Sequence, residues 1–225
     1  MHIEPGVVNG AKLALSYATA AGAGLWTVKL AWETLKTSSV PGFVARVAAS
    51  TLAVFFFFEV LPKFPVGVSE VHFILGSTLF LLFGAAPAAL GLALGLLAQG
   101  MMFAPGDLPQ YFMNLTTLLV PLFAISALAR KIIAPGTPYV DLSYVQALKL
   151  STAYQAGVVA WVGFWAVYGQ GAGAENMAAI AAFGAAYMLV IIIEPLVDLA
   201  VLAGAKSIRD ISKWQVFHPH LHKGH

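Results

Sequence analysis

The sequence VARVAASTLAVFFFFEVL, from Val44 to Leu61, contains only one basic and one acidic side chain. A run of about 20 mostly apolar residues is long enough for a helix to cross a lipid bilayer. Similar runs recur along nearly the whole chain, which is 60% hydrophobic and 10% charged, with a mean hydropathy of +0.83. Soluble domains contain about 25% charged residues. The sequence therefore predicts an all-α integral membrane protein.

We expect about seven transmembrane helices in one bundle, at residues 8–32, 44–61, 71–83, 87–103, 112–129, 150–168 and 177–205. The third run is short, so we expect it to be tilted or part of the preceding loop to enter the membrane. Asp141 or Ser143 is a plausible cap for the sixth helix. We expect Pro195 to interrupt the seventh run, which would leave Glu194 and Asp198 at the inner interface. The alternative is that both acids lie deep in the membrane and mark an ion or proton path.

The basic residues predict the orientation of the bundle. With an outer N-terminus, nine of the 12 Lys and Arg residues lie in inner segments, and the outer loops contain Lys63 alone. Inner loops of membrane proteins are enriched in Lys and Arg. The N-terminus and His72 are therefore expected outside, and the tail is expected in the cytoplasm. We expect no cleavable signal peptide, because the segment before the first span contains Glu4 and no basic region.

The composition also excludes several kinds of site. The chain has no cysteine, which rules out disulfides, thiolate metal sites, iron–sulfur clusters and Cys nucleophiles. It contains no Gly-x-x-x-x-Gly-Lys-Ser/Thr motif, and its polar segments are too short for a soluble domain. We therefore expect no ATPase within this chain.

The first two residues, Met1 and His2, could together chelate a metal ion. The amino group, the backbone nitrogen of His2 and its ring would close two fused chelate rings, and a second imidazole could complete a plane of four nitrogens. Planar nitrogen coordination suits Ni(II) or Cu(II). The alternative is that a histidine in second position has no function, because a motif needs its structural context.

His72 is the next histidine, at the expected outer start of the third span. Ionisable residues at membrane depth are costly and are commonly functional. The alternatives are a solvated histidine without a role, or a general base in a membrane-embedded enzyme.

Several motifs together resemble the CbiM/NikM family of membrane subunits that capture substrate for energy-coupling-factor-type cobalt and nickel importers. These motifs are the start Met1-His-Ile3, Phe64-Pro-Val-Gly67 before His72, Gln99-Gly-Met-Met-Phe103, Gly106-Asp107 and Phe112-Met-Asn114. They cover about the first 130 residues. Later spans are similar only in being hydrophobic.

The resemblance implies that Co(II) or Ni(II) is transported substrate, held by Met1, His2 and His72. It further implies separate partners: a transmembrane coupling subunit, cytoplasmic ATPase subunits and a small accessory membrane subunit, in a bacterial plasma membrane. No nucleic acid is expected. Residues 1–205 would form one transmembrane metal-binding domain, and 206–225 a cytoplasmic tail. A membrane-embedded enzyme or a metal-free structural membrane protein is the alternative.

Other polar residues are weaker candidates. Asn114 is expected to orient the N-terminal loop or His72, or else to cap a helix. Ser69 and Gln99 are weaker candidates for the same role. Two positions depart from the family pattern, because Glu4-Pro5 replaces the usual Pro-Asp and Glu70 precedes the histidine. We expect both glutamates to be solvated loop acids.

The tail concentrates four histidines in the sequence His218-Pro-His-Leu-His-Lys-Gly-His225. Histidine-rich tracts can bind metal. The equal alternative is a basic tail at the lipid surface.

Overall fold

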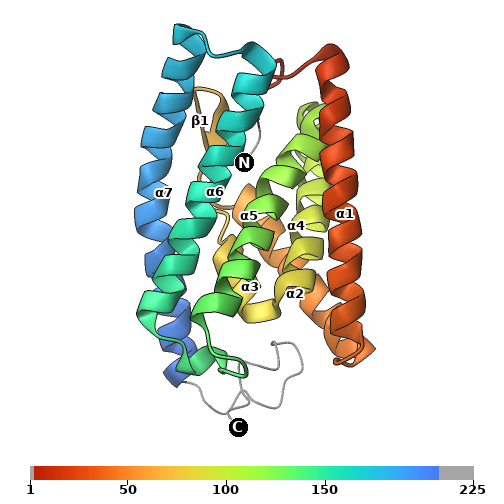
Figure 1. The fold of residues 1–225 in the computed structure, drawn as a ribbon, viewed down its shortest axis with the longest axis vertical. Coiled ribbons are helices and arrows are strands. Elements are labelled where there is room, and N and C mark those ends of the chain that lie inside the picture. Colours follow the sequence, from red (N-terminus) through yellow and green to blue (C-terminus); the bar gives the residue numbers. More distant parts are fainter. Residues whose placement is uncertain (1–2, 208–225) are drawn as a thin grey trace.

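The structure, a computed structural model, describes residues 3–207. In this range the chain forms seven α-helices, a β-hairpin and three short 3-10 turns, which confirms the all-α membrane bundle (Figure 1). The helices are α1 (Leu13–Leu35), α2 (Val40–Glu59), α3 (Gly76–Phe83), α4 (Ala85–Met102), α5 (Tyr111–Ile132), α6 (Tyr144–Gln170) and α7 (Ala174–Ser207). The hairpin pairs β1 (Phe64–Val66) with β2 (Ser69–Val71), and the 3-10 turns are Gly10–Lys12, Pro105–Gln110 and Tyr139–Asp141.

Five of the helical segments are long and apolar enough to cross a membrane. They are α2, α4, α6, α7 and the continuous stretch Pro105–Ile132 that contains α5. Helix α1 lies at one edge of the bundle, against α5 and α4, while α6 and α7 form the opposite edge (Figure 1).

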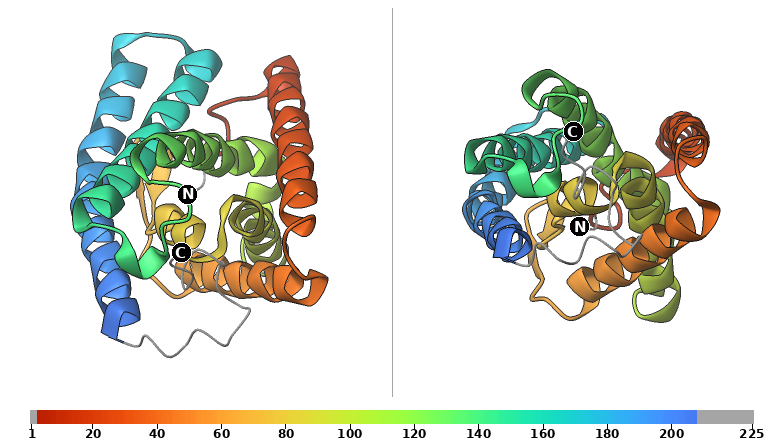
Figure 2. Two further views of the ribbon diagram at one scale, coloured as in Figure 1. Left: turned by 60° about the horizontal axis from the view of Figure 1, so that its bottom comes forward. Right: turned by 90° about the horizontal axis from the view of Figure 1, so that it is seen from below.

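Helix α3 is only eight residues long and lies in the interior of the bundle (Figure 2). It contacts α2, α4, α5, α6 and α7. The hairpin before it also enters the protein interior, since Val68 and Ser69 are 3% and 0% exposed. The second strand of this hairpin is therefore packed inside the protein, whereas Phe64 of the first strand is exposed.

The start of α6 agrees with the sequence. The Ser143 hydroxyl accepts a hydrogen bond from the backbone N–H of Gln146, and the Gln146 side chain accepts one from the Ser143 N–H. This reciprocal pair satisfies two N–H groups that the first turn of a helix otherwise leaves open.

The expected break at Pro195, with Glu194 and Asp198 at the interface, was wrong. Helix α7 continues through Pro195 without a break, and Glu194 and Asp198 are 0% and 1% exposed. Neighbouring elements can accommodate a proline in a membrane helix. The two acids bond to residues of α3, of the loop before it and of α6, and these partners cannot be identified from the sequence around Pro195.

Gly76 allows the first turn of α3 to lie against α6. A Cβ atom at this position would be 2.2 Å from the ring of Tyr154, which is fully buried and donates its hydroxyl to the Leu118 carbonyl at 3.3 Å. The ring therefore has no open space into which it can move.

We predict that Gly76→Ala destabilises the bundle by about 2 kcal/mol, because overpacking a filled core costs about 1–3 kcal/mol. Thermal unfolding of the detergent-solubilised protein measures the change. Gly22→Ala is the matched control, since Gly22 lies on an exposed part of α1 with no atom within 4 Å of its would-be Cβ. An equal loss of stability in both variants would contradict the packing argument.

Candidate functional site

The N-terminal segment enters the bundle from the end where the hairpin lies. Ile3 is 1% exposed, and its backbone N–H donates to the side-chain oxygen of Asn114 at 2.8 Å. Ile3 also forms an antiparallel bridge with Ser69, and the N–H of Glu4 donates to the Val68 carbonyl at 3.2 Å. Since the other edge of β2 pairs with β1, the segment adds to the free edge of the hairpin.

The C-terminal end of α6 packs against this segment. A Cβ atom at Gly169 would lie 1.9 Å from the carbonyl oxygen of Val7, so only glycine permits the approach. The Lys12 ammonium donates to the Gly169 carbonyl at 2.7 Å, where a cation also complements the negative end of the helix. The role of Gly169 cannot be identified from the sequence, because it depends on a contact between residues 162 positions apart.

His72 follows β2 directly and is 1% exposed. Alternate residues of a strand share a face, which places Glu70 beside His72. The two side chains share a hydrogen bond of 2.8 Å between Nε2 and Oε2. The imidazole also packs edge to face on Phe58, with ring centroids 5.4 Å apart. The expectation of a solvated loop acid was therefore wrong for Glu70.

Asn114 joins the N-terminal segment to α5. It lies in the first turn of that helix, whose N-cap is Gln110, so the helix-cap alternative is excluded. Asn114 is 1% exposed, and its Nδ2 atom has no hydrogen-bond partner among the described residues. A buried N–H donor without an acceptor is costly, which suits a site in which a further group binds to this Nδ2 atom.

Gln99 lies close to Asn114 across a cavity of about 10 Å³, which both residues line together with Asp107 and Tyr111. This volume suits about one water molecule. The Gln99 amide donates to Glu59 at 3.1 Å, and Glu59 pairs with Lys63 at 3.6 Å, as the four-residue spacing predicts.

Three acidic side chains, Glu4, Glu70 and Asp107, lie close enough together to interact electrostatically. Partial burial raises the pKa of Glu4, and the negative charges of Glu70 and Asp107 raise it further. A cation that enters here is favoured, because it relieves this repulsion.

The structure therefore brings Ile3, Ser69, His72 and Asn114 into one region, with Gln99 beside Asn114. Met1, His2 and the tail histidines lie outside the described residues. Within residues 3–207, no group of three or more His, Cys, Asp or Glu side chains could hold a metal ion.

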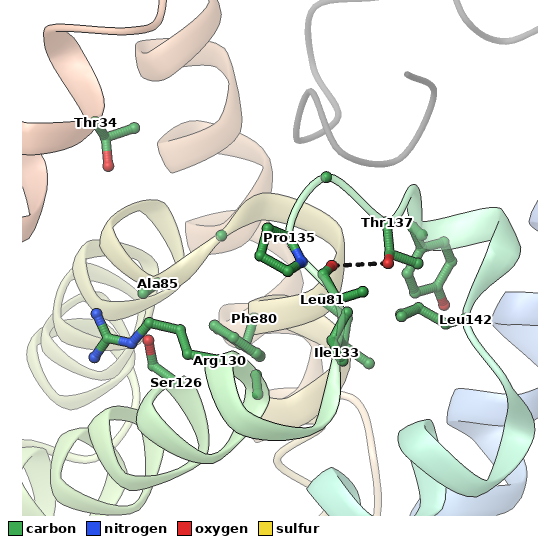
Figure 3. A pocket seen from close by; sticks show the side chains of 15 residues that line it. Thr34, Phe80, Leu81, Ala85, Ser126, Arg130, Ile133, Pro135, Thr137 and Leu142 are labelled. Carbon is green, nitrogen blue, oxygen red and sulfur yellow. Dashed lines mark hydrogen bonds between the residues drawn. The ribbon is translucent and has the colours of Figure 1, made fainter. Parts of the chain in front are cut away.

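A larger groove of about 650 Å³ lies at the other end of α3, between the ends of α1 and α5 and the 133–142 loop (Figure 3). Its lining is mostly apolar, with Arg130 and Tyr139 as its titratable groups. Among the described residues that line this groove, none is a histidine or a carboxylate.

Comparisons with known proteins agree with this geometry. The chain matches the family described as "Cobalt uptake substrate-specific transmembrane region" over residues 2–210. A solved structure described as "Crystal Structure of an transition metal transporter" is similar with a TM-score of 0.70 and 18% identity, over 93% of this chain and 94% of that chain. At this identity the likeness concerns the fold. A search of curated proteins gives no match.

We predict that Asn114→Leu loosens the N-terminal segment without unfolding the bundle. The Ile3 N–H would lose its acceptor in a buried site, at a cost of about 1–3 kcal/mol. Hydrogen exchange measured by mass spectrometry should show faster exchange at residues 3–8 and little change in α5.

Thr117→Val is the matched control, one turn further along α5. Thr117 is also buried, but its hydroxyl bonds only to the Met113 carbonyl of its own helix. Unchanged exchange at residues 3–8 in Asn114→Leu would show that this bond does not hold the segment.

Proposed function

The chain belongs to the family of cobalt-uptake substrate-specific transmembrane regions, and from that membership we propose that it captures Co(II) or Ni(II) for an ATP-driven importer. The family makes it a membrane subunit of metal uptake. The capture chemistry, the metal ligands and the energy source are the proposed part.

The observation that carries the proposal is the buried hydrogen bond between the Ile3 N–H and Asn114. A peptide bond links that nitrogen to His2, so the first described residue after His2 is held inside the bundle. The bridge between Ile3 and Ser69 places Ile3 beside a residue three positions before His72. Ile3 and His72 are thus joined to one hairpin.

In the proposed site, Met1 is the mature amino terminus. Its amino group, the backbone and ring nitrogens of His2 and the ring of His72 supply four nitrogens. Four nitrogens in a plane suit Ni(II), and selectivity between similar divalent ions depends on geometry and availability. A carboxylate that binds an imidazole fixes the ring and raises its basicity, and Glu70 fits this role at 2.8 Å.

The proposed energy source lies outside this chain, since the sequence contains no phosphate-binding loop. A separate transmembrane coupling subunit and cytoplasmic ATPase subunits would drive release, with a small accessory membrane subunit as a further partner. The rival function, an enzyme with His72 as general base, is disfavoured because the matching family is described as a transmembrane region for cobalt uptake.

We predict that acetylation of the Met1 amino group abolishes Ni(II) and Co(II) binding, because it removes the free amine from the chelate and creates no new one. His72→Ala should have the same effect. Equilibrium binding by calorimetry measures both changes. All proteins should carry alanine in place of the four tail histidines His218, His220, His222 and His225, so that the tail contributes no binding.

Lys29→Gln is the matched control, since it removes one positive charge from an exposed side chain of α1, as acetylation does at Met1. This variant should bind metal as the parent protein does. Equal affinity in the protein acetylated at Met1 would exclude the amine as a ligand and overturn the proposed coordination.

A further inference from the structure

The loop that carries His72 into α3 depends on one side chain from another helix. The backbone N–H groups of Ile74 and Leu75 both donate to Oε1 of Glu194 on α7, the second of them at 3.0 Å. Leu75 has a φ of +52° and is the one non-glycine residue with positive φ among residues 3–207. A residue with a Cβ atom disfavours this conformation, so the loop needs external contacts to keep it.

Glu194 is itself held in place. Its other oxygen accepts a hydrogen bond from the Gln155 amide of α6, and the residue is 0% exposed. The start of α3 lies directly in front of it, and the N-terminal end of a helix favours a negative charge. The carboxylate is therefore held from two sides, by backbone N–H groups and by Gln155.

One turn further along α7, Asp198 has a similar environment. It is 1% exposed and accepts hydrogen bonds from the hydroxyl groups of Ser77, at 2.7 Å, and Thr78. Asp198 therefore binds α3 itself, whereas Glu194 binds the loop before α3.

The same face of α7 supports the hairpin and the loop along their whole length. The Ala179 carbonyl fills the space beside Gly67 in the hairpin turn, and the Tyr187 hydroxyl donates to the His72 carbonyl at 3.5 Å. Residues 179, 187 and 194 recur after eight and seven positions, a spacing that keeps them on one side of a helix. Glu194 is the charged member of this row.

We propose that Glu194 is a positioning residue for the metal ligand His72, because it fixes the backbone of the loop that aims the imidazole. The inference rests on the proposed function, in which His72 binds the metal. It assigns to α7 a direct influence on metal affinity, although α7 contributes no metal ligand.

The test compares three substitutions in the full-length protein without tail histidines. Glu194→Ala removes the acceptor for Ile74 and Leu75. Glu194→Gln keeps an acceptor oxygen, and Gln155, whose Oε1 has no partner among the described residues, can turn its amide to match. Asp198→Asn is the matched control, because Asp198 is also a buried acid of α7 but bonds to α3 and not to the loop before it.

The measurements are Ni(II) affinity, the visible absorption spectrum of bound Ni(II), and the unfolding temperature. Glu194→Ala should weaken affinity by about 10- to 100-fold, the usual effect of removing a group that orients a metal ligand, and should shift the spectrum. Glu194→Gln should restore both. Asp198→Asn should lower the unfolding temperature and leave the spectrum unchanged.

If Glu194→Ala does not fold, Glu194→Asp is the replacement test. It keeps the negative charge but shortens the side chain by one methylene, which moves the carboxylate away from the N–H groups of Ile74 and Leu75. Weaker affinity with a shifted spectrum in the folded protein supports the proposal. The parent affinity and spectrum in the folded Glu194 variant, or an equal loss in Asp198→Asn, overturns it.

Two further proteins separate this inference from the proposed function. Suppose that the parent protein binds Ni(II) and His72→Ala does not. A Glu194→Ala protein with the parent affinity and spectrum would then refute the positioning role and leave the proposed function intact. If the parent protein with a native N-terminus binds no metal, both the proposed function and this inference fail.

Discussion

A helix that begins inside a membrane protein must find partners for its first N–H groups within the protein, because lipid supplies none. Helix α3 begins in the centre of this bundle, and the other helices are arranged around it. Glu194 of α7 accepts the N–H groups of Ile74 and Leu75 at this start, and Gln155 of α6 supports Glu194. Asp198 of α7 accepts the hydroxyl groups of Ser77 and Thr78 in the first turn of α3. The same contacts bind the last two helices of the chain to the loop that carries His72.

The same constraint applies to the N-terminal segment. Its backbone is buried at the free edge of the hairpin. There the Asn114 side chain accepts a hydrogen bond from the Ile3 N–H, and the Val68 carbonyl accepts one from the Glu4 N–H. Each contact joins the segment to a different element, so the segment is placed by α5 and the hairpin together. The segment and the loop that carries His72 are therefore held by the same hairpin.

Part of this site could be predicted from the sequence. The position of His72 at the head of a short apolar run, and the selection of Asn114 and Ser69, follow from local patterns and from a family resemblance. The partners of Glu70 and Glu194 could not be predicted this way. Glu70 was expected in solvent, but alternation along β2 places it against His72. Glu194 was expected at an interface, but its acceptor oxygens meet N–H groups that lie about 120 residues earlier in the chain.

The sequence by itself determined that this protein is a helical membrane bundle, because the length and apolarity of its segments are local properties. Composition also narrowed the range of metal ligands, since a chain without cysteine has no thiolate donors. Only the tertiary structure decided that α3 starts at Gly76, that Gly169 admits the N-terminal segment, and that α7 holds the His72 loop. These features depend on close contacts between distant residues, and the hydrophobic pattern of a single helix does not encode which residue it will meet.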